Sequence, residues 1–126
     1  MQAISSPEAP KPIGPYSAAL KVGSFIFFSG QIPLKDGELV GGGIREQTQQ
    51  VCENLRALCE AAGISLAHIV KTTVFLTDLA DFQIMNEVYS SFFQPPYPAR
   101  TTIGVAQLPR GAKIELEAVA FIEAQG

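Results

Sequence analysis

The sequence predicts a small α+β domain in which a single mixed β-sheet carries two helices on one face. Two segments have the apolar spacing of amphipathic helices, others alternate or are rich in β-branched residues as strands are, and the elements follow in the order ββαβαββ. That order contains too few helices for a doubly wound sheet. At 126 residues the chain has the length of one domain, so we expect residues 1–126 to form a single domain.

The first part of the chain is predicted to form an arm and two strands. Four prolines disfavour a helix in residues 1–15, which we expect to be an extended arm. Strands are predicted over residues 16–22 and 25–29, and the apolar run of the second strand suggests burial on both of its faces. Residues 35–38 have the composition of a turn.

The middle of the chain changes from helix to strand. Helical periodicity covers residues 44–62, and Gly63 is a natural stop. β-branched residues then predict a strand over residues 69–77, with alternate residues from Val70 to Leu76 on one face.

A second helix is predicted between Asp78 and the proline-rich segment 94–98. Asp78 is a suitable N-cap residue, and the prolines end the helix. The apolar residues between them recur at helical spacing and predict a buried stripe made of Phe82, Met85, Tyr89, Phe92 and Phe93.

Two strands are predicted to close the chain, over about residues 100–106 and 113–123. Residues 108–111 have the composition of a turn and suggest that the two strands form a hairpin. In the second strand Ile114 and alternate residues after it face the core, whereas Glu115 faces the opposite side. No third helix remains to cover that side, which favours sheets packed between subunits. A charged fraction of only 17% favours oligomerisation as well.

The composition argues against several classes of function. The nine Lys and Arg residues are scattered and the net charge is −3, so we expect no nucleic-acid partner. No apolar stretch approaches a membrane span, and the N-terminus lacks a secretory signal, so we expect a cytoplasmic protein without a membrane partner. One histidine and two cysteines, Cys52 and Cys59, seven positions apart argue against a metal site and a disulfide.

Arg100 and Glu115 are the candidate functional residues of the last two strands. An arginine at a strand start is usually solvated or ion-paired, but its planar guanidinium also suits the carboxylate of a small substrate. Glu115, on a face that a subunit would cover, suits either a structural salt bridge or the activation of water. In a hairpin centred near residue 110, the two would be roughly 13–17 Å apart. They would then share a site only across substrate and water, or between subunits.

Motifs along the whole chain resemble those of the Rid/YjgF family of enamine and imine deaminases. Each motif is weak alone, whereas their order and spacing together are specific. The matching segments are residues 13–17 (IGPYS), 29–32 (SGQI), 70–76 (VKTTVFL), 85–89 (MNEVY), 98–100 (PAR), 108–109 (LP) and 113–120 (KIELEAVA).

The resemblance implies a chorismate-mutase-like fold, a homotrimer with sites in the clefts between subunits, and no cofactor. It implies hydrolysis of 2-aminoacrylate, its imine 2-iminopropanoate, and 2-iminobutanoate to 2-keto acids and ammonia, which protects pyridoxal-phosphate enzymes from damage. By motif, Arg100 corresponds to the arginine that holds the substrate carboxylate, and Glu115 to the glutamate that positions the attacking water. The residues that match pocket positions are Tyr16, Ser29, Gly30 and Asn86.

The chain departs from one common form of the family pattern at Thr102. Many members have a cysteine two residues after the arginine, so a covalent cysteine mechanism is excluded here. We expect a backbone N–H contact between Thr102 and the substrate instead. Two alternatives stay open: a non-catalytic ligand-binding or chaperone-like trimer, and a ribonuclease or translation inhibitor. The acidic net charge argues against the latter.

Overall fold

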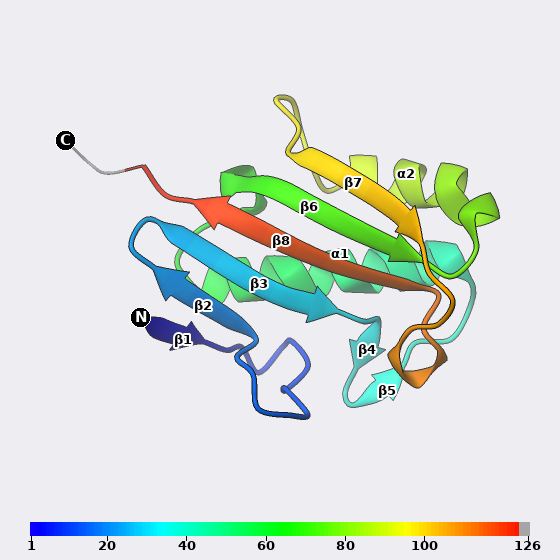
Figure 1. Ribbon diagram of the computed structural model, residues 1–126, viewed down its shortest axis with the longest axis horizontal. Coiled ribbons are helices and arrows are strands. Elements are labelled where there is room, and N and C mark those ends of the chain that lie inside the picture. Colours follow the sequence, from blue (N-terminus) through cyan, green and yellow to red (C-terminus); the bar gives the residue numbers. More distant parts are fainter. Residues whose placement is uncertain (124–126) are drawn as a thin grey trace.

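A six-stranded mixed sheet with two helices on one face forms the body of this computed structural model, which describes residues 1–123 (Figure 1). β6 and β7 pair in parallel, and the other neighbours pair antiparallel. The predicted α+β class is confirmed. In spatial order the strands are β1 (Gln2–Ile4), β2 (Ala19–Val22), β3 (Phe25–Gln31), β8 (Ile114–Phe121), β6 (Ile69–Leu76) and β7 (Ala99–Gly104), and a separate hairpin consists of β4 (Leu34–Lys35) and β5 (Glu38–Leu39).

The helices lie where the periodicity predicted them, and both cover the same face of the sheet (Figure 1). They are α1 (Ile44–Ala61) and α2 (Phe82–Ser90), with short 3-10 helices at η1 (Leu66–His68), η2 (Leu79–Asp81) and η3 (Pro109–Gly111). Asp78 caps η2 because its carboxylate accepts the N–H of Ala80 at 2.9 Å. α2 follows η2 directly, so the predicted cap is present but the first turn is a 3-10 turn.

The core lies between the helices and the sheet. Leu55 of α1 is fully buried, as are Ile26 of β3 and Leu116 of β8, and all three belong to one continuous cluster. Full burial of one such side chain contributes about 1.5–3 kcal/mol. Cys52 and Cys59 belong to the same cluster as free thiols, as their spacing predicted.

Two buried polar side chains of α1 hold the ends of the central strands. Nδ2 of Asn54 donates to the carbonyl oxygens of Ile32 (3.2 Å) and Leu34 (3.1 Å), just after β3. Oε1 of Gln47 accepts the N–H of Lys113 at 2.8 Å, just before β8. α1 therefore fixes the chain where β3 ends and where β8 begins.

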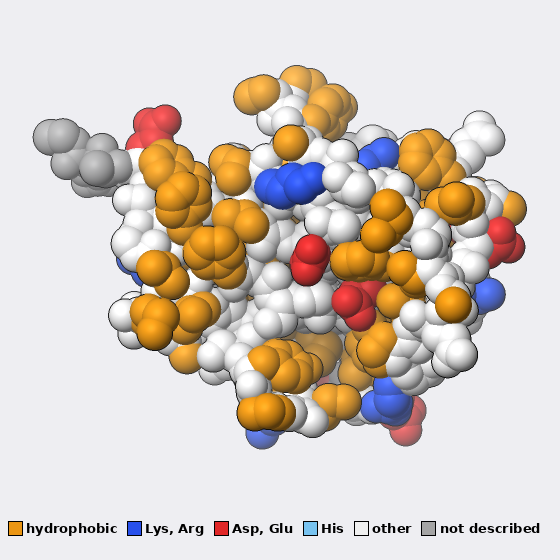
Figure 2. Space-filling model, viewed as in Figure 1, with side chains coloured by type: hydrophobic (Ala, Val, Ile, Leu, Met, Phe, Trp, Pro, Cys, Tyr) orange, Lys and Arg blue, Asp and Glu red, His pale blue; other side chains and the backbone are white. Residues whose placement is uncertain are grey.

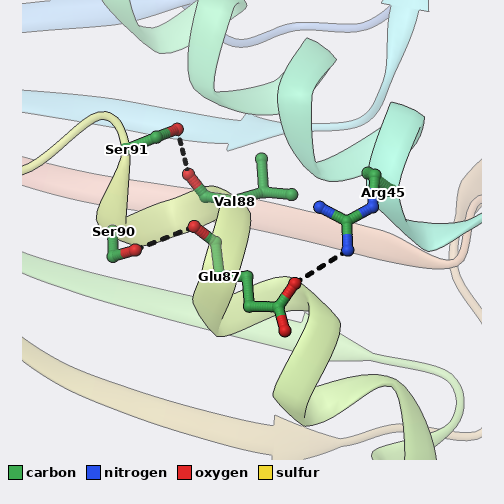
Figure 3. A network of polar contacts seen from close by, with 5 residues as sticks. All are labelled: Arg45, Glu87, Val88, Ser90 and Ser91. Atoms are coloured by element: carbon green, nitrogen blue, oxygen red, sulfur yellow. Dashed lines mark hydrogen bonds and ion pairs between the residues drawn. The ribbon is translucent and has the colours of Figure 1, made fainter.

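An ion pair on the surface joins α1 to α2 (Figure 3). Arg45 Nη2 and Glu87 Oε2 are 2.8 Å apart, and both side chains are more than half exposed, so the pair contributes at most about 1 kcal/mol. In the last turn of α2 the hydroxyls of Ser90 and Ser91 donate to the carbonyls of Glu87 (2.8 Å) and Val88 (2.6 Å). These bonds satisfy carbonyls that a helix end leaves without partners.

The predicted hairpin of the last two strands is wrong, because β6 lies between β7 and β8. Thr72 of β6 pairs with Arg100 on one side and with Ala118 on the other. β7 runs parallel to β6, and the chain then passes the end of β6 through η3 and returns as β8. Alternation along a strand reveals its buried face but not its neighbour, so the sequence pattern could not identify this order.

Two expectations for the N-terminal third are also wrong. Residues 1–15 are not entirely an arm, since β1 pairs with β2 at the edge of the sheet. β3 is not buried on both faces: Ile26 and Phe28 are buried, but Phe25 and Phe27 are 43% and 47% exposed. Their rings lie on the face opposite the helices, which we name the open face.

Two apolar residues lie off the faces that the sequence predicted for them. A register shift between Ile69 and Lys71 turns Val70 out to 44% exposure and puts Ile69 into the core. Phe82, expected in the buried stripe of α2, is 41% exposed because it follows the 3-10 turn at the helix start. Of the rest of that stripe, Met85, Tyr89 and Phe93 are buried as predicted, whereas Phe92 is only partly buried.

Candidate active site

Arg100 lines a cavity of about 480 Å³ between β7 and α2. The carbon Cζ of its guanidinium is 4.9 Å from the ring centroid of Tyr89 and 5.6 Å from that of Phe82. It forms no ion pair with any residue in the range 1–123. Its N–H donors are therefore available to a ligand in the cavity, whose other lining residues are Asn86, Tyr89, Ser90, Tyr97 and Pro98.

Glu115 belongs to a second cluster, on the open face. A Cβ atom added to Gly30 would lie only 2.7 Å from Cδ of Glu115, so the carboxylate rests on the Gly30 backbone and a larger residue there would displace it. Tyr16 lines a shallow cleft together with Gly30. Ser29 Oγ donates to the carbonyl of Ser17 at 2.5 Å and ties the segment before β2 to β3. Glu115, Gly30, Ser29 and Tyr16 are thus brought together.

Within one chain the two clusters lie on opposite faces of the sheet. Arg100 pairs with Thr72, whose buried side chain faces the helices, whereas Glu115 pairs with Phe75, three residues further along β6. Three residues of strand span roughly 10 Å, and the whole thickness of the sheet separates the side chains as well. Each chain therefore carries two partial sites. One contains Arg100 and Asn86, and the other contains Glu115 and Gly30.

Thr102 lies on β7, the outermost strand of the sheet. The N–H of Val105 donates to the carbonyl of Leu76 at 2.8 Å, and successive residues of a strand point their N–H groups to alternate sides. The N–H groups of Arg100, Thr102 and Gly104 consequently point to the free edge. The hydroxyl of Thr102 is buried with no hydrogen-bond partner among the described residues.

The environment of Glu115 favours its protonated form. Burial raises the pKa of its carboxyl above the ordinary value of 4.5, and the like charge of Glu117 adds to the rise. A carboxylate with a raised pKa is a stronger base than an exposed one.

The open face carries a broad apolar surface around its acidic residues (Figure 2). The rings of Phe25 and Phe121 are 5.1 Å apart between centroids, and those of Phe25 and Phe27 are 6.2 Å apart. Apolar side chains exposed together in this way mark an interaction site. The exposed members that we name the apolar patch are Val22, Phe25, Phe27, Val70, Ile103 and Phe121.

The part of the chain that the structure describes offers few groups suited to a metal ion, to a reactive thiol or to a membrane. Residues 1–123 contain no cluster of three or more His, Cys, Asp or Glu residues arranged around a metal ion. Burial raises the pKa of both Cys52 and Cys59 to about 12, so both remain protonated thiols. No helix within these residues has the length and apolar character needed to cross a bilayer.

Sequence reasoning missed several residues of the Arg100 cavity, notably Tyr97 and Ser90. It assigned Tyr89 and Phe82 only to the hydrophobic stripe. The signal was present: Phe82, Asn86 and Tyr89 recur at i, i+4 and i+7, so a pocket residue at Asn86 implies that both rings border the pocket.

Comparison with known proteins assigns the chain to a family. The family described as Endoribonuclease L-PSP, to which the Rid/YjgF proteins belong, matches residues 6–122. The chain belongs to this family. A RutC family protein of Pyrococcus abyssi is 53% identical over 124 residues, which are 97% of this chain and 98% of that protein. A 2-iminobutanoate/2-iminopropanoate deaminase of Dermatophagoides farinae is 45% identical over 122 residues, 95% of each chain.

Solved structures of Rid-family proteins have the same fold. RidA of the Antarctic bacterium Psychrobacter sp. PAMC 21119 matches with a TM-score of 0.93 and 44% identity, over 97% of this chain and 100% of RidA. TdcF of E. coli with bound serine matches with a TM-score of 0.93 and 42% identity, over 98% of this chain and 100% of TdcF. The resemblance that the sequence motifs indicated is confirmed.

Proposed function

We propose that this Rid-family protein is a deaminase that hydrolyses 2-imino acids, such as 2-iminopropanoate and 2-iminobutanoate, to 2-keto acids and ammonia. The observation that carries the proposal is Arg100, an arginine without an acidic partner in the described chain that lines a cavity with polar groups from Asn86, Ser90 and Tyr97. Relatives named as such deaminases, 45–46% identical over nearly the whole chain, support this substrate class.

The chemistry requires little more than positioning. The imine carbon is already electrophilic, and water adds to it to form a carbinolamine that expels ammonia and leaves the keto acid. Arg100 binds the substrate carboxylate through charge-assisted hydrogen bonds, and the free N–H of Thr102 contributes a further donor. Held in this way, the substrate reacts as if in an intramolecular reaction.

Glu115 takes the role of the group that orients water. It accepts a proton from the attacking water and passes it to the imine nitrogen, which gives the carbinolamine. The carbinolamine hydroxyl then gives up its proton, which the nitrogen takes up as it leaves as ammonia. The raised pKa of Glu115 makes it a more effective base than an exposed carboxylate. Gly30 leaves room for the Glu115 carboxylate, and Tyr16 with Ser29 shapes the adjoining cleft.

The proposal includes a homotrimer in the cytoplasm, with each complete site formed between two subunits. Two observations support shared sites: Arg100 and Glu115 lie on opposite faces of one sheet, and the apolar patch lies on the same face as Glu115. One subunit then supplies Arg100, Asn86 and Thr102, and its neighbour supplies Glu115, Gly30, Ser29 and Tyr16.

A coupled assay tests both the reaction and the shared site. A dehydratase generates the imine, and keto-acid formation is followed with and without this protein. Arg100→Ala and Glu115→Ala should each lose at least about a hundredfold in activity. When equal amounts of the two variants are refolded together, about a quarter of the sites should combine one intact Arg100 with one intact Glu115 and regain activity.

The outcomes separate the alternatives. Full activity of Arg100→Ala would overturn the deaminase proposal, and mixed variants that stay inactive would overturn the shared site. Binding of 2-ketobutyrate without faster imine hydrolysis would favour a non-catalytic ligand-binding trimer. The name of the family leads to a second test, for RNA cleavage, in which activity that survives purification and is lost in Arg100→Ala would favour a ribonuclease.

A further inference from the structure

The guanidinium of Arg100 is held by aromatic rings and not by acidic side chains. Within residues 1–123 the ion pairs are Arg45 with Glu87 and Arg56 with Glu53, and neither involves Arg100. An acidic partner would neutralise the charge and occupy the N–H donors. The rings of Tyr89 and Phe82 neither neutralise the charge nor occupy the donors. In a cation–π contact the guanidinium lies over the face of the ring, and its N–H donors remain unpaired.

The ring of Tyr89 is itself fixed at both ends. Its hydroxyl lies 2.8 Å from Oγ1 of Thr72, and both residues are buried. Its ring stacks on Phe93 with centroids 4.4 Å apart. Thr72 is also the strand partner of Arg100 in the β6–β7 pairing. Thr72 thus pairs with the backbone of Arg100 and, through Tyr89, also supports the Arg100 side chain.

Tyr89 is suited to support and not to proton transfer. Burial raises the pKa of its phenol, and this outweighs the opposite effects of the hydrogen bond to Thr72 and the charge of Arg100. The phenol therefore remains neutral across the physiological range, and its oxygen is already committed to Thr72.

We propose that Tyr89, anchored by Thr72, is a positioning residue that orients the guanidinium of Arg100 toward the cavity, with Phe82 as the second ring. The inference rests on the proposed function for its kinetic readout. The role requires the aromatic ring of Tyr89 and not its acidity. It follows that the pair of rings determines how tightly a carboxylate is bound and has little influence on the rate of the chemical step.

The test compares Tyr89→Leu with Tyr89→Phe. Tyr89→Leu should raise KM for the imine, and Kd for the product 2-ketobutyrate in calorimetry, about three- to thirtyfold, with kcat changed less than about threefold. Tyr89→Phe keeps the ring but loses the hydroxyl that Thr72 holds, so its KM should rise, but by less than in Tyr89→Leu. Phe92→Leu is the matched control, because that ring lies 5.2 Å from Arg56 and not near Arg100, so its KM should not change.

A measurement independent of activity distinguishes failure of this inference from failure of the proposed function. The NMR signals of the Arg100 side chain should show slowed guanidinium rotation in the parent and in Tyr89→Phe, and faster rotation in Tyr89→Leu. Faster rotation without any deaminase activity would support the positioning role alone. An unchanged Arg100 signal in folded Tyr89→Leu, or an equal rise in KM in Phe92→Leu, would overturn the inference.

Discussion

Glu115 illustrates how a single residue can lower stability while it serves a site. Its folded pKa lies above the ordinary 4.5, so at neutral pH the fold holds a carboxylate that the unfolded chain accommodates more readily. Glu115→Gln should therefore raise Tm at pH 7. The gain should shrink as the pH falls through the raised pKa, and vanish below about pH 4 where both states are protonated. Activity should fall at least about a hundredfold.

Glu117→Gln is the control for this prediction. It removes the like charge that helps to raise the Glu115 pKa, so activity should persist and the acidic limb of the pH–rate profile should shift to lower pH. Thermal unfolding between pH 4 and 8 measures the change in Tm of Glu115→Gln. The coupled assay measures the activity and the pH–rate profile of both variants. A Glu115→Gln variant that is less stable at pH 7, or that keeps full activity, would contradict the prediction.

Sequence reasoning at the level of single residues was accurate for faces and incomplete for neighbours. The alternation of β8 correctly put Glu115 on the face away from the helices. It could not reveal that Gly30 lies beneath Glu115, because that contact depends on the pairing of β3 with β8 and on the irregularity between Phe28 and Gln31. The motif resemblance selected Gly30 without supplying that physical reason.

At the level of elements, α1 does more than cover the sheet, and Asn54 offers the test. Its side chain is 1% exposed and satisfies the carbonyls of Ile32 and Leu34 while it accepts a bond from Gln50. Asn54→Ala leaves these buried groups without partners, so it should lower the free energy of unfolding by about 2–4 kcal/mol in urea denaturation. Gln49→Ala, which loses only an exposed bond to Glu53, should remain within about 0.5 kcal/mol.

The prediction for Asn54 also has a consequence for the site. The segment that Asn54 holds follows directly after Gly30 and Gln31, so the variant should lose some activity at temperatures where it remains folded. An Asn54→Ala protein as stable as the parent would show that water replaces the lost bonds and that α1 does not fix the end of β3.

The elements were predictable where one periodicity dominates and not where partners must be chosen. Both helices and the strand at residues 69–76 were located because their apolar spacing or β-branched content is unambiguous. The hairpin of residues 100–106 and 113–123 was inferred from adjacency in the chain and was wrong. β6 lies between β7 and β8, which are consecutive strands in the sequence, and the residue pattern of neither strand indicates this.

At the scale of the whole molecule, the open face explains the low charge content of the chain. A sheet with helices on one side leaves its other side for solvent or for a partner, and here that side carries the apolar patch. Composition alone suggested such a surface. The sequence already put Glu115 on the side that a subunit would cover, whereas the residues that make up the patch depend on how β3, β8 and β6 pair.

The apolar patch gives the final prediction. Phe27→Asp puts a charge within the apolar patch, a surface that the proposed trimer buries and where an unpaired carboxylate is strongly disfavoured. Analytical ultracentrifugation should show a shift from three chains to one, and activity should fall with the loss of shared sites. Gln49→Asp is the control, since Gln49 is exposed on α1, away from the open face and from both partial sites, and this variant should keep the parent assembly. A Phe27→Asp protein that remains a fully active trimer would show that subunits meet elsewhere. The two partial sites would then need another way to join, since nothing in a single chain brings Arg100 to the face that carries Glu115.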